Sequence, residues 1–225
     1  MRIVAWNCNM RFRDKIDKVL SLNADIAIIS ECEAPVKGGF AHNVIWVGDN
    51  ANKGLAVFSL SGKKIEVAPQ YNDAFKYVVP VICGEYLIFA VWACDIDKYR
   101  YVEQVYQAML YYKNSLRHKK IIIAGDFNSN SIWDSNYRKY GSHSALVQYL
   151  DIFGIVSAYH VLNGEECGKE SVPTFYLYRH RERPYHLDYC FLSQELVKCV
   201  ADFSIGSPDS WLRYSDHLPL LLTLE

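Results

Sequence analysis

The amino-acid sequence predicts an α/β fold in which two mixed β-sheets pack face to face and helices cover their outer sides. Apolar runs typical of strands occur along the whole chain, whereas few segments have the periodicity of a helix. The chain opens with a strand, a helix and a second strand, and a series of short strands follows. Many strands with few helices bury their apolar surfaces well in such layers.

The first 30 residues predict a β-α-β unit. Apolar runs over residues 2–8 and 26–30 predict two strands. Between them, Phe12, Ile16 and Val19 recur at helical spacing, so a helix is expected over about 12–22.

The next 60 residues predict an antiparallel meander. Short apolar runs are separated here by turns rich in glycine and asparagine. The expected strands cover residues 43–47, 54–60, 63–68, 75–82 and 85–93.

The second half predicts two longer helices among further strands. One helix is expected near 99–116, followed directly by a strand over 121–125. The other is expected over about 142–153, with Ser142 as its N-cap and Gly154 at its end. Strands near 155–160, 173–178, 186–192, 200–205 and 218–224 complete the chain. Because no linker or repeat interrupts the pattern, residues 1–225 are expected to form one domain.

Composition limits the class of protein. With 225 residues and 51% hydrophobic content, the chain can bury a sizeable core. The net charge of −1 argues against a broadly basic protein that coats nucleic acid. Local basic clusters remain at 117–120 and 179–183, so a polyanion would have to be held locally.

The cysteines and the amino terminus indicate a soluble cytoplasmic protein. The seven cysteines lack paired CxxC spacing, which predicts free thiols in a reducing compartment. A strand begins within three residues of Met1, with no signal-like segment before it. Since no run approaches the roughly 20 apolar residues of a membrane span, none is expected.

Polar side chains gather where the strand-like runs end. Carboxylate and amide oxygens predominate among them, with a single imidazole, which suits Mg²⁺ or Mn²⁺ and argues against zinc. Glu31 and Asp216, assisted by Asn7, are the predicted metal ligands. The complete set is Asn7, Asn9, Glu31, Asp126, Asn128, Asp188, Asp216 and His217.

The remaining members of this set predict phosphoester cleavage. Asp126 could orient or deprotonate a nucleophilic water, while Asn128 and Asn9 donate hydrogen bonds. His217, held by Asp188 through its other ring nitrogen, would act on the phosphoryl group as a donor or a base.

Each residue alone also has a structural interpretation. Asn7 and Asn9 could cap a turn, Glu31 could be a surface acid, and the polar residues at 126–128 could form a capping turn. Asp216 and His217 could be a simple pair at the edge of the domain. Asp188 is harder to explain in this way, because a carboxylate within an apolar strand needs a partner. The ordered combination favours the functional interpretation.

With these motifs the chain resembles the endonuclease/exonuclease/phosphatase superfamily from Asn7 to the final strand. Five motifs in order carry the resemblance: Trp6-Asn7-Cys8-Asn9, Ser30-Glu31, Gly125-Asp126-Phe127-Asn128, His186-Leu187-Asp188-Tyr189 and Ser215-Asp216-His217. The resemblance implies a four-layer α/β sandwich, a divalent metal around Glu31 and hydrolysis of a phosphoester.

Two positions depart from the family pattern. The family usually carries His or Tyr at the end of the strand that precedes the long helix, but this chain has Ala93 there. Alanine cannot donate a hydrogen bond to a phosphate, so another group must replace it or the activity is altered. Many relatives have Arg two residues before the strand Asp, where this chain has His186.

Loops near the motifs offer residues for substrate binding. Trp133 and Trp211 lie in loops expected to be exposed, and a tryptophan there could stack on a base at about 1–3 kcal/mol, although packing is its more common role. Arg179 and Arg213 could grip phosphates or belong to a solvated hairpin tip.

Three functions are compatible with these residues. The first is a metal-dependent endonuclease or exonuclease that hydrolyses phosphodiester bonds of DNA or RNA. The second is a phosphatase or phosphodiesterase for a small molecule or lipid headgroup, favoured by the near-neutral charge. The third is a non-catalytic binding module, motivated by Ala93 and opposed by the otherwise complete motifs.

Overall fold

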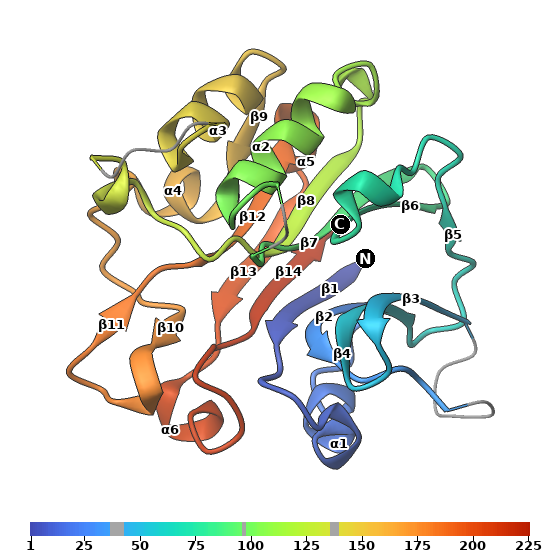
Figure 1. Ribbon diagram of the computed structural model, residues 1–225, viewed down its shortest axis with the longest axis vertical. Helices are drawn as coiled ribbons and strands as arrows, with labels where there is room; N and C mark the ends of the chain where they lie inside the picture. Colours follow the sequence, from blue (N-terminus) through green and yellow to red (C-terminus); the bar gives the residue numbers. More distant parts are fainter. Residues whose placement is uncertain (37–42, 96–97, 136–139) are drawn as a thin grey trace.

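The computed structural model describes residues 1–36, 43–95, 98–135 and 140–225, and it confirms two mixed sheets. In each sheet one central pair is parallel, β1 with β2 and β7 with β8, and the other pairs are antiparallel. The first sheet has the order β13-β14-β1-β2-β4-β3, formed by Val200–Ile205, Leu220–Leu224, Arg2–Asn7, Ile26–Cys32, Lys53–Ser59 and Asn43–Asn50 (Figure 1).

The second sheet and a small hairpin complete the strands. The second sheet has the order β5-β6-β7-β8-β12-β9, formed by Glu66–Val67, Val78–Cys83, Tyr86–Trp92, Ile121–Asp126, Asp188–Ser193 and Ile155–Ser157. The hairpin pairs β10 (Phe175–Tyr176) with β11 (Pro184–Tyr185).

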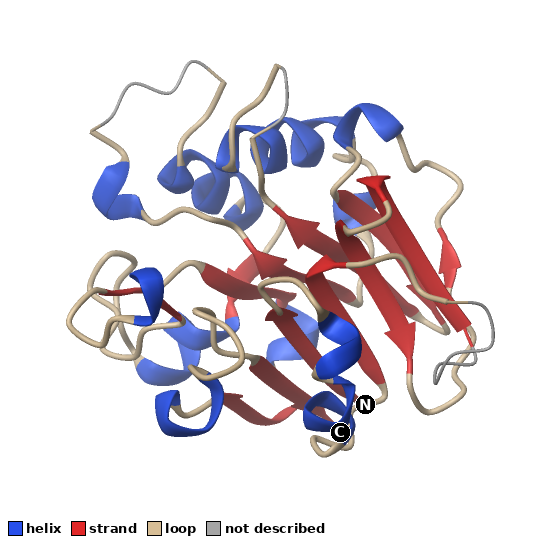
Figure 2. Cartoon of the chain, turned by 60° about the horizontal axis from the view of Figure 1, so that its bottom comes forward, coloured by secondary structure: helices blue, strands red, loops and turns tan. Residues whose placement is uncertain are grey.

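Helices lie outside the two sheets (Figure 2). They are α1 (Ile16–Leu20), α2 (Val102–Tyr111), α3 (His143–Asp151), α4 (Ala158–Asn163), α5 (Gln194–Val197) and α6 (Pro208–Trp211). Short 3₁₀ helices are η1 (Phe12–Asp14), η2 (Asp73–Phe75), η3 (Ser115–Arg117), η4 (Ser131–Trp133) and η5 (Leu177–Arg179).

The alternation of side chains along each strand creates three apolar cores. Ile3 and Ala5 of β1 face the core between the sheets, while Val4 and Trp6 face a second core that includes Val19 of α1 and residues of α6. The second sheet likewise packs its outer face against α2 and α3. The four-layer sandwich is therefore confirmed.

Several predicted element bounds are wrong. The strand expected over 155–160 ends at Ser157, because α4 begins at Ala158 and continues to a left-handed Gly164. The strand expected over 173–178 keeps two residues, since Tyr178 turns the chain with a φ of 57°. The strand expected from 75 starts at Val78 because Phe75 belongs to η2.

Other predicted elements are shorter than expected. The helix expected over 12–22 divides into η1 and α1, and the helix expected over 99–116 becomes α2 followed by η3. The strand expected over 63–68 shrinks to two residues, and the final strand begins at Leu220 instead of 218. Local hydrophobic patterns mark such elements but do not fix where hydrogen bonding ends.

All seven cysteines are free, which confirms that expectation. Four of them, Cys8, Cys32, Cys83 and Cys190, are buried. None of the helices in the described part of the chain has the length and apolar character needed to span a bilayer.

Gly125 is a position in β8 that tolerates no side chain. Its φ is +142°, and a Cβ there would lie 2.0 Å from the carbonyl oxygen of Val91 on β7. We expect Gly125→Ala to lower the free energy of unfolding by about 3 kcal/mol or more, because the backbone strain at this φ and the clash with Val91 both destabilise the folded state. Urea unfolding monitored by circular dichroism measures the change.

Gly62→Ala is the matched control. Gly62 also has a positive φ, +79°, but nothing lies within 4 Å of the added Cβ. Gly62→Ala should lower the free energy of unfolding by about 1–2 kcal/mol, which is the strain of a side chain at a positive φ alone. Equal losses in the two variants would contradict the role given to the contact with Val91.

Candidate active site

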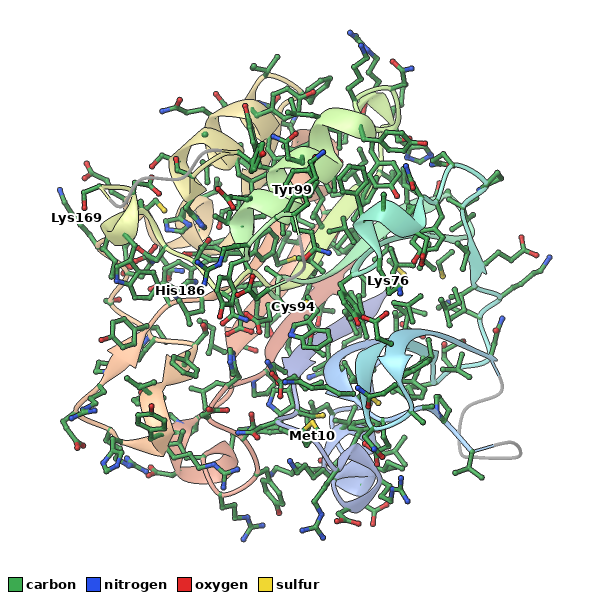
Figure 3. The ribbon with its side chains drawn as sticks, in the orientation of Figure 1. Met10, Lys76, Cys94, Tyr99, Lys169 and His186 are labelled. Atoms are coloured by element: carbon green, nitrogen blue, oxygen red, sulfur yellow. The ribbon has the colours of Figure 1, made fainter. Side chains whose placement is uncertain are left out.

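The carboxyl ends of two central strands bring the predicted residues together. Asn7 is the last residue of β1 in one sheet, and Asp126 is the last residue of β8 in the other. The Asn7 side chain donates a hydrogen bond of 2.9 Å from Nδ2 to Oδ2 of Asp126. Cys94, which follows β7, is labelled near the middle of Figure 3, and Met10, which follows β1, is labelled below it.

Asp126 is the most buried acid of the site, with no exposed surface. The backbone N–H of Asn128 donates to its Oδ1 at 2.8 Å, and Nδ2 of Asn128 donates to its Oδ2 at 2.9 Å. Burial raises the pKa of Asp126 to about 7, although His217 and these hydrogen bonds oppose the rise. The carboxyl group therefore titrates near neutral pH.

Asp188 and His217 form a buried pair beside Asp126. Asp188 is the first residue of β12 and lies opposite Asp126 in the antiparallel register. Nδ1 of His217 lies 2.9 and 3.1 Å from the two Asp188 oxygens, and its Nε2 lies 3.9 Å from Oδ2 of Asp126. The backbone N–H of Asp188 donates to Oγ1 of Thr174.

The charge of His217 follows from this position. Burial on its own would lower the pKa of the imidazole, but the carboxylates of Asp188 and Asp126 outweigh it and raise the pKa to about 10. The position between two acids therefore favours the positively charged form of His217.

The segment that carries His217 is fixed to β1. Oγ of Ser215 donates to the carbonyl oxygen of Asn7 at 2.7 Å and accepts from the N–H of His217 at 3.0 Å. Nε1 of Trp6 donates to the carbonyl oxygen of His217 at 2.9 Å. The first and last motifs of the chain thus hold each other in place.

Asn9 lies in a loop of unusual backbone conformation. Asn9, Met10 and Arg11 all have φ between 50° and 66°, the left-handed region. The Lys15 ammonium donates to the carbonyl oxygens of Cys8, Asn9 (3.2 Å) and Met10 (2.8 Å), which ties this loop together. Nδ2 of Asn9 donates to Oδ1 of Asp216 at 2.7 Å, so these two predicted residues meet.

Glu31 is placed differently from the other predicted metal ligands. It also has a positive φ, 57°, and its side chain is 20% exposed. Among the contacts of the described residues, its carboxylate pairs with Lys53 at 3.1 Å and with neither Asn7 nor Asp216. The Lys53 ammonium also lies 5.3 Å from the ring centre of Trp92. The sequence analysis missed Lys53, which lies in no motif.

The prediction that Trp211 is exposed is wrong. The side chain is 4% exposed and packs edge to face against Trp6, with ring centres 5.0 Å apart. It therefore stabilises the β1 end of the site and cannot stack on a base. Trp133 is partly exposed and packs against Tyr185 at 5.3 Å.

Arg179 and Arg213 are exposed and adjacent, because the Arg179 guanidinium donates to the carbonyl oxygens of Arg213 and Tyr214 at 3.4 Å. Lys15 belongs to the same region: burial lowers its pKa, and the charges of Arg179 and Arg11 lower it further. Lys18 lies 4.9 Å from the ring centre of Trp211. We call Arg11, Lys15, Lys18, Arg179 and Arg213 the basic surface. The sequence analysis missed Arg11, Lys15 and Lys18, because they are far from Arg179 and Arg213 in the sequence.

The two departures from the family pattern have structural roles. Ala93 is fully buried, and its carbonyl oxygen accepts from Nδ2 of Asn128 at 2.9 Å, so this position serves the site through its backbone. His186 is buried, and its Nδ1 lies 2.8 Å from the carbonyl oxygen of Val172.

The donor atoms fit a hard divalent cation. Carboxylate and amide oxygens predominate, and the single imidazole already has its Nδ1 on Asp188. One donor atom each from Asp126, Asp188 and His217 lie within 4.8 Å of one another. Asp188 and His217 already pair with each other, however, and both oxygens of Asp126 accept hydrogen bonds from Asn7 or Asn128. Glu31 and Asp216 are partly exposed, and the side-chain oxygen of Asn7, although buried, has a lone pair beside the one that accepts from the N–H of Asn9.

Comparison with known proteins gives consistent results. The model of the endonuclease/exonuclease/phosphatase family matches residues 4–217. No curated protein sequence matches the chain.

The fold is also similar to solved structures. A 3′-5′ exonuclease, NExo, from Neisseria meningitidis has a TM-score of 0.76 and 21% identity, with both chains covered completely. The structure of the 3′ phosphatase NExo from Neisseria bound to a product DNA hairpin has a TM-score of 0.76 and 20% identity, and the match covers 100% of this chain and 99% of that one. An AP endonuclease from Archaeoglobus fulgidus has a TM-score of 0.74 and 19% identity, and the match covers 100% of this chain and 99% of that one.

The match over residues 4–217 includes every motif described above. The chain therefore belongs to the endonuclease/exonuclease/phosphatase family, a family of phosphoric ester hydrolases.

Proposed function

We propose that this protein is a divalent-metal-dependent nuclease that hydrolyses phosphodiester bonds of DNA or RNA. The observation that carries the proposal is the buried network in which Asn7 of one sheet and Asn128 both donate to Asp126, beside the Asp188–His217 pair. A carboxylate held so firmly, with an imidazole beside it, can accept and donate protons at fixed positions.

Glu31, Asp216 and Asn7 would hold the metal, Mg²⁺ or Mn²⁺. The oxygens of these three residues, with Glu31 and Asp216 partly exposed, suit an ion that keeps several waters and takes few protein ligands. The bound ion would supply charge neutralisation at the phosphoryl oxygens.

The protein side chains would divide the remaining work. Asp126, whose pKa is about 7, would orient and deprotonate the attacking water, because a base is most effective near its own pKa. Asn9 would donate to an oxygen of the substrate or the water with the amide hydrogen that is not bound to Asp216. Asn128 would have to release its bond to Ala93 or Asp126 to donate in the same way, and until then it holds the proposed base in place. His217, positioned by Asp188, would stabilise the charge that develops on the phosphoryl group.

The basic surface favours a polyanionic substrate. Its members lie next to the Asn9 loop, whose side chain reaches Asp216, so a nucleic acid backbone could cross them on its way to the site. The names of the structural neighbours, an exonuclease and an AP endonuclease, support the same substrate class.

A small phosphoester is the second candidate for the substrate, favoured by the net charge of −1.

We further propose that residues 1–225 act as one domain, which the family match over 4–217 supports. We also propose that the protein works in the cytoplasm, which its seven free thiols support.

Asp126→Asn tests the proposed base. With Mg²⁺ or Mn²⁺, the wild-type protein should cleave at least one of abasic duplex, single-stranded DNA or RNA, and faster than a phosphomonoester. The variant should lose at least about 100-fold in rate, since an amide cannot accept the proton. Asp202→Asn, an exposed acid in β13, should leave the rate unchanged. Full activity of Asp126→Asn would refute the role.

Glu31→Gln tests the metal site. We expect the Mg²⁺ concentration for half-maximal cleavage to rise at least about 10-fold, because loss of a ligand should cost no less than loss of an outer-shell partner. Glu85→Gln, a 63% exposed acid paired with Lys120, is the control. An unchanged Mg²⁺ dependence in Glu31→Gln would exclude Glu31 as a ligand.

His217 should make stability depend on pH. Its pKa rises from 6.5 in the unfolded chain to about 10, so its contribution to stability is complete below about pH 6.5 and disappears as pH passes about 10. Between pH 7 and 10, with EDTA present, the free energy of unfolding should fall more steeply for wild type than for His217→Gln. His118→Gln, at an exposed site, should follow wild type; parallel curves for wild type and His217→Gln would contradict the assignment.

A further inference from the structure

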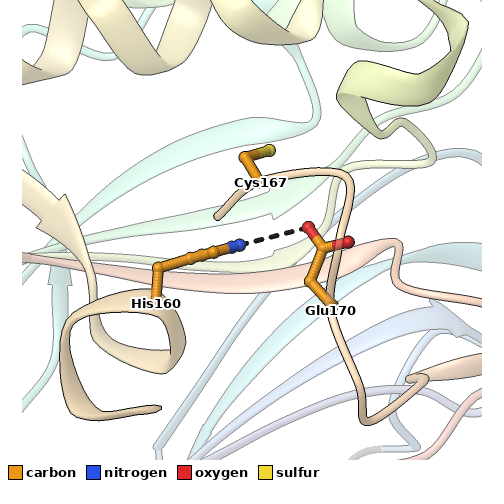
Figure 4. A group of neighbouring side chains, drawn as sticks. All are labelled: His160, Cys167 and Glu170. Atoms are coloured by element: carbon orange, nitrogen blue, oxygen red, sulfur yellow. Dashed lines mark hydrogen bonds and ion pairs between the residues drawn. The ribbon is translucent and has the colours of Figure 1, made fainter. Parts of the chain in front are cut away.

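A second group of side chains with metal-ligand chemistry lies outside the candidate active site. His160 belongs to α4, and Cys167 and Glu170 lie in the loop that follows it (Figure 4). One donor atom from each residue lies within 4.8 Å of the others, and Nε2 of His160 is 3.1 Å from Oε1 of Glu170. We propose that these three residues bind a zinc ion that fixes residues 164–173 to α4.

The types of donor atom select zinc. A ring nitrogen, a thiol sulfur and a carboxylate oxygen form a mixed set that zinc accepts and that magnesium, which prefers oxygen, does not. The proposed active-site cation and this ion would therefore occupy different sites without competing.

Neighbouring groups orient two of the ligands. Oγ of Ser157 lies 2.7 Å from Nδ1 of His160, which leaves Nε2 directed at Glu170. The backbone N–H of Gly168 donates to Oε1 of Glu170 at 3.0 Å, and Nδ2 of Asn130 donates to both carboxylate oxygens at 3.1 Å. Such outer partners are typical of metal sites, where they fix the ligand geometry.

Glu170 is a buried negative charge with no Lys or Arg partner among the described residues. Its side chain is 4% exposed, and His160 is its ionic neighbour. A cation at this position would neutralise a charge that is otherwise costly to bury.

A cavity beside the cluster provides for the fourth ligand. It has a volume of about 290 Å³ and is lined by His143, His160 and Cys167, among others. Nε2 of His143 is buried and has no hydrogen-bond partner among the described residues. A water in this cavity would complete a tetrahedral site.

The proposed ion would brace the candidate active site. The segment 164–173 leads to Thr174, whose hydroxyl oxygen accepts hydrogen bonds from the N–H groups of Leu187 and Asp188. Asn130, which hydrogen bonds to Glu170, follows Asp126 by four residues. Zinc would thus help to hold Asp188 in position without contacting the groups that react.

Zinc titration of the full chain tests the proposal. Protein stripped with a chelator should bind one Zn²⁺ per chain tightly in excess Mg²⁺, measured against a chromophoric competitor, and its melting temperature should rise. With Co²⁺ in place of Zn²⁺, a thiolate-to-cobalt charge-transfer band should appear. Absence of tight binding or of this band in the wild-type protein would overturn the proposal.

Variants assign the ligands. Cys167→Ser should abolish the charge-transfer band, and Glu170→Gln should weaken zinc binding at least tenfold. Cys199→Ser, which removes a partly exposed thiol elsewhere, and Glu31→Gln should both bind as wild type. Tight binding retained in Cys167→Ser, or lost in Cys199→Ser, would place the ion elsewhere and refute the assignment.

Discussion

The hydrogen bond from Asn7 to Asp126 is the interaction on which the arrangement of the site depends. It is buried, and it joins the two sheets where their central strands end, at the edge of the apolar core between them. Asp126 cannot be left unpaired at such depth, because an isolated buried carboxylate is costly. The amides of Asn7 and Asn128 meet this requirement, and the bond from Asn7 links the two sheets.

Further hydrogen bonds and ion pairs surround Asp126 and hold His217 in place. His217 lies between Asp126 and Asp188, and its backbone is bound by Trp6 and Ser215. Residues from both ends of the chain therefore depend on one another for their positions. A polar network of this kind is stable when all members are satisfied, and removal of one member leaves the others unpaired.

Much of this could be predicted from the sequence. The continuous apolar runs of β1 and β8 identified the strands, and a polar residue at the end of a buried strand must either be solvated or have a partner. Asp188 was the clearest case, since it lies inside an apolar run, and the structure places it against His217 as expected.

Other features depend on contacts that no local pattern encodes. Trp211 looked like a loop tryptophan, but α6 turns it onto Trp6, more than 200 residues earlier in the chain. Lys53 meets Glu31 only because β4 pairs with β2. Helix α4 was missed because its six residues are too few for helical periodicity to stand out from a strand pattern.

The buried thiols have a consequence for the chemical durability of the protein. Cys8 lies between the two site asparagines, and burial raises its pKa to about 12, as it does for Cys190. Oxidants attack the thiolate, so a thiol that stays protonated and covered reacts slowly. Peroxide would therefore reach Cys8 only after the β1 end of the sandwich had opened, and oxidative damage there would report unfolding rather than cause it.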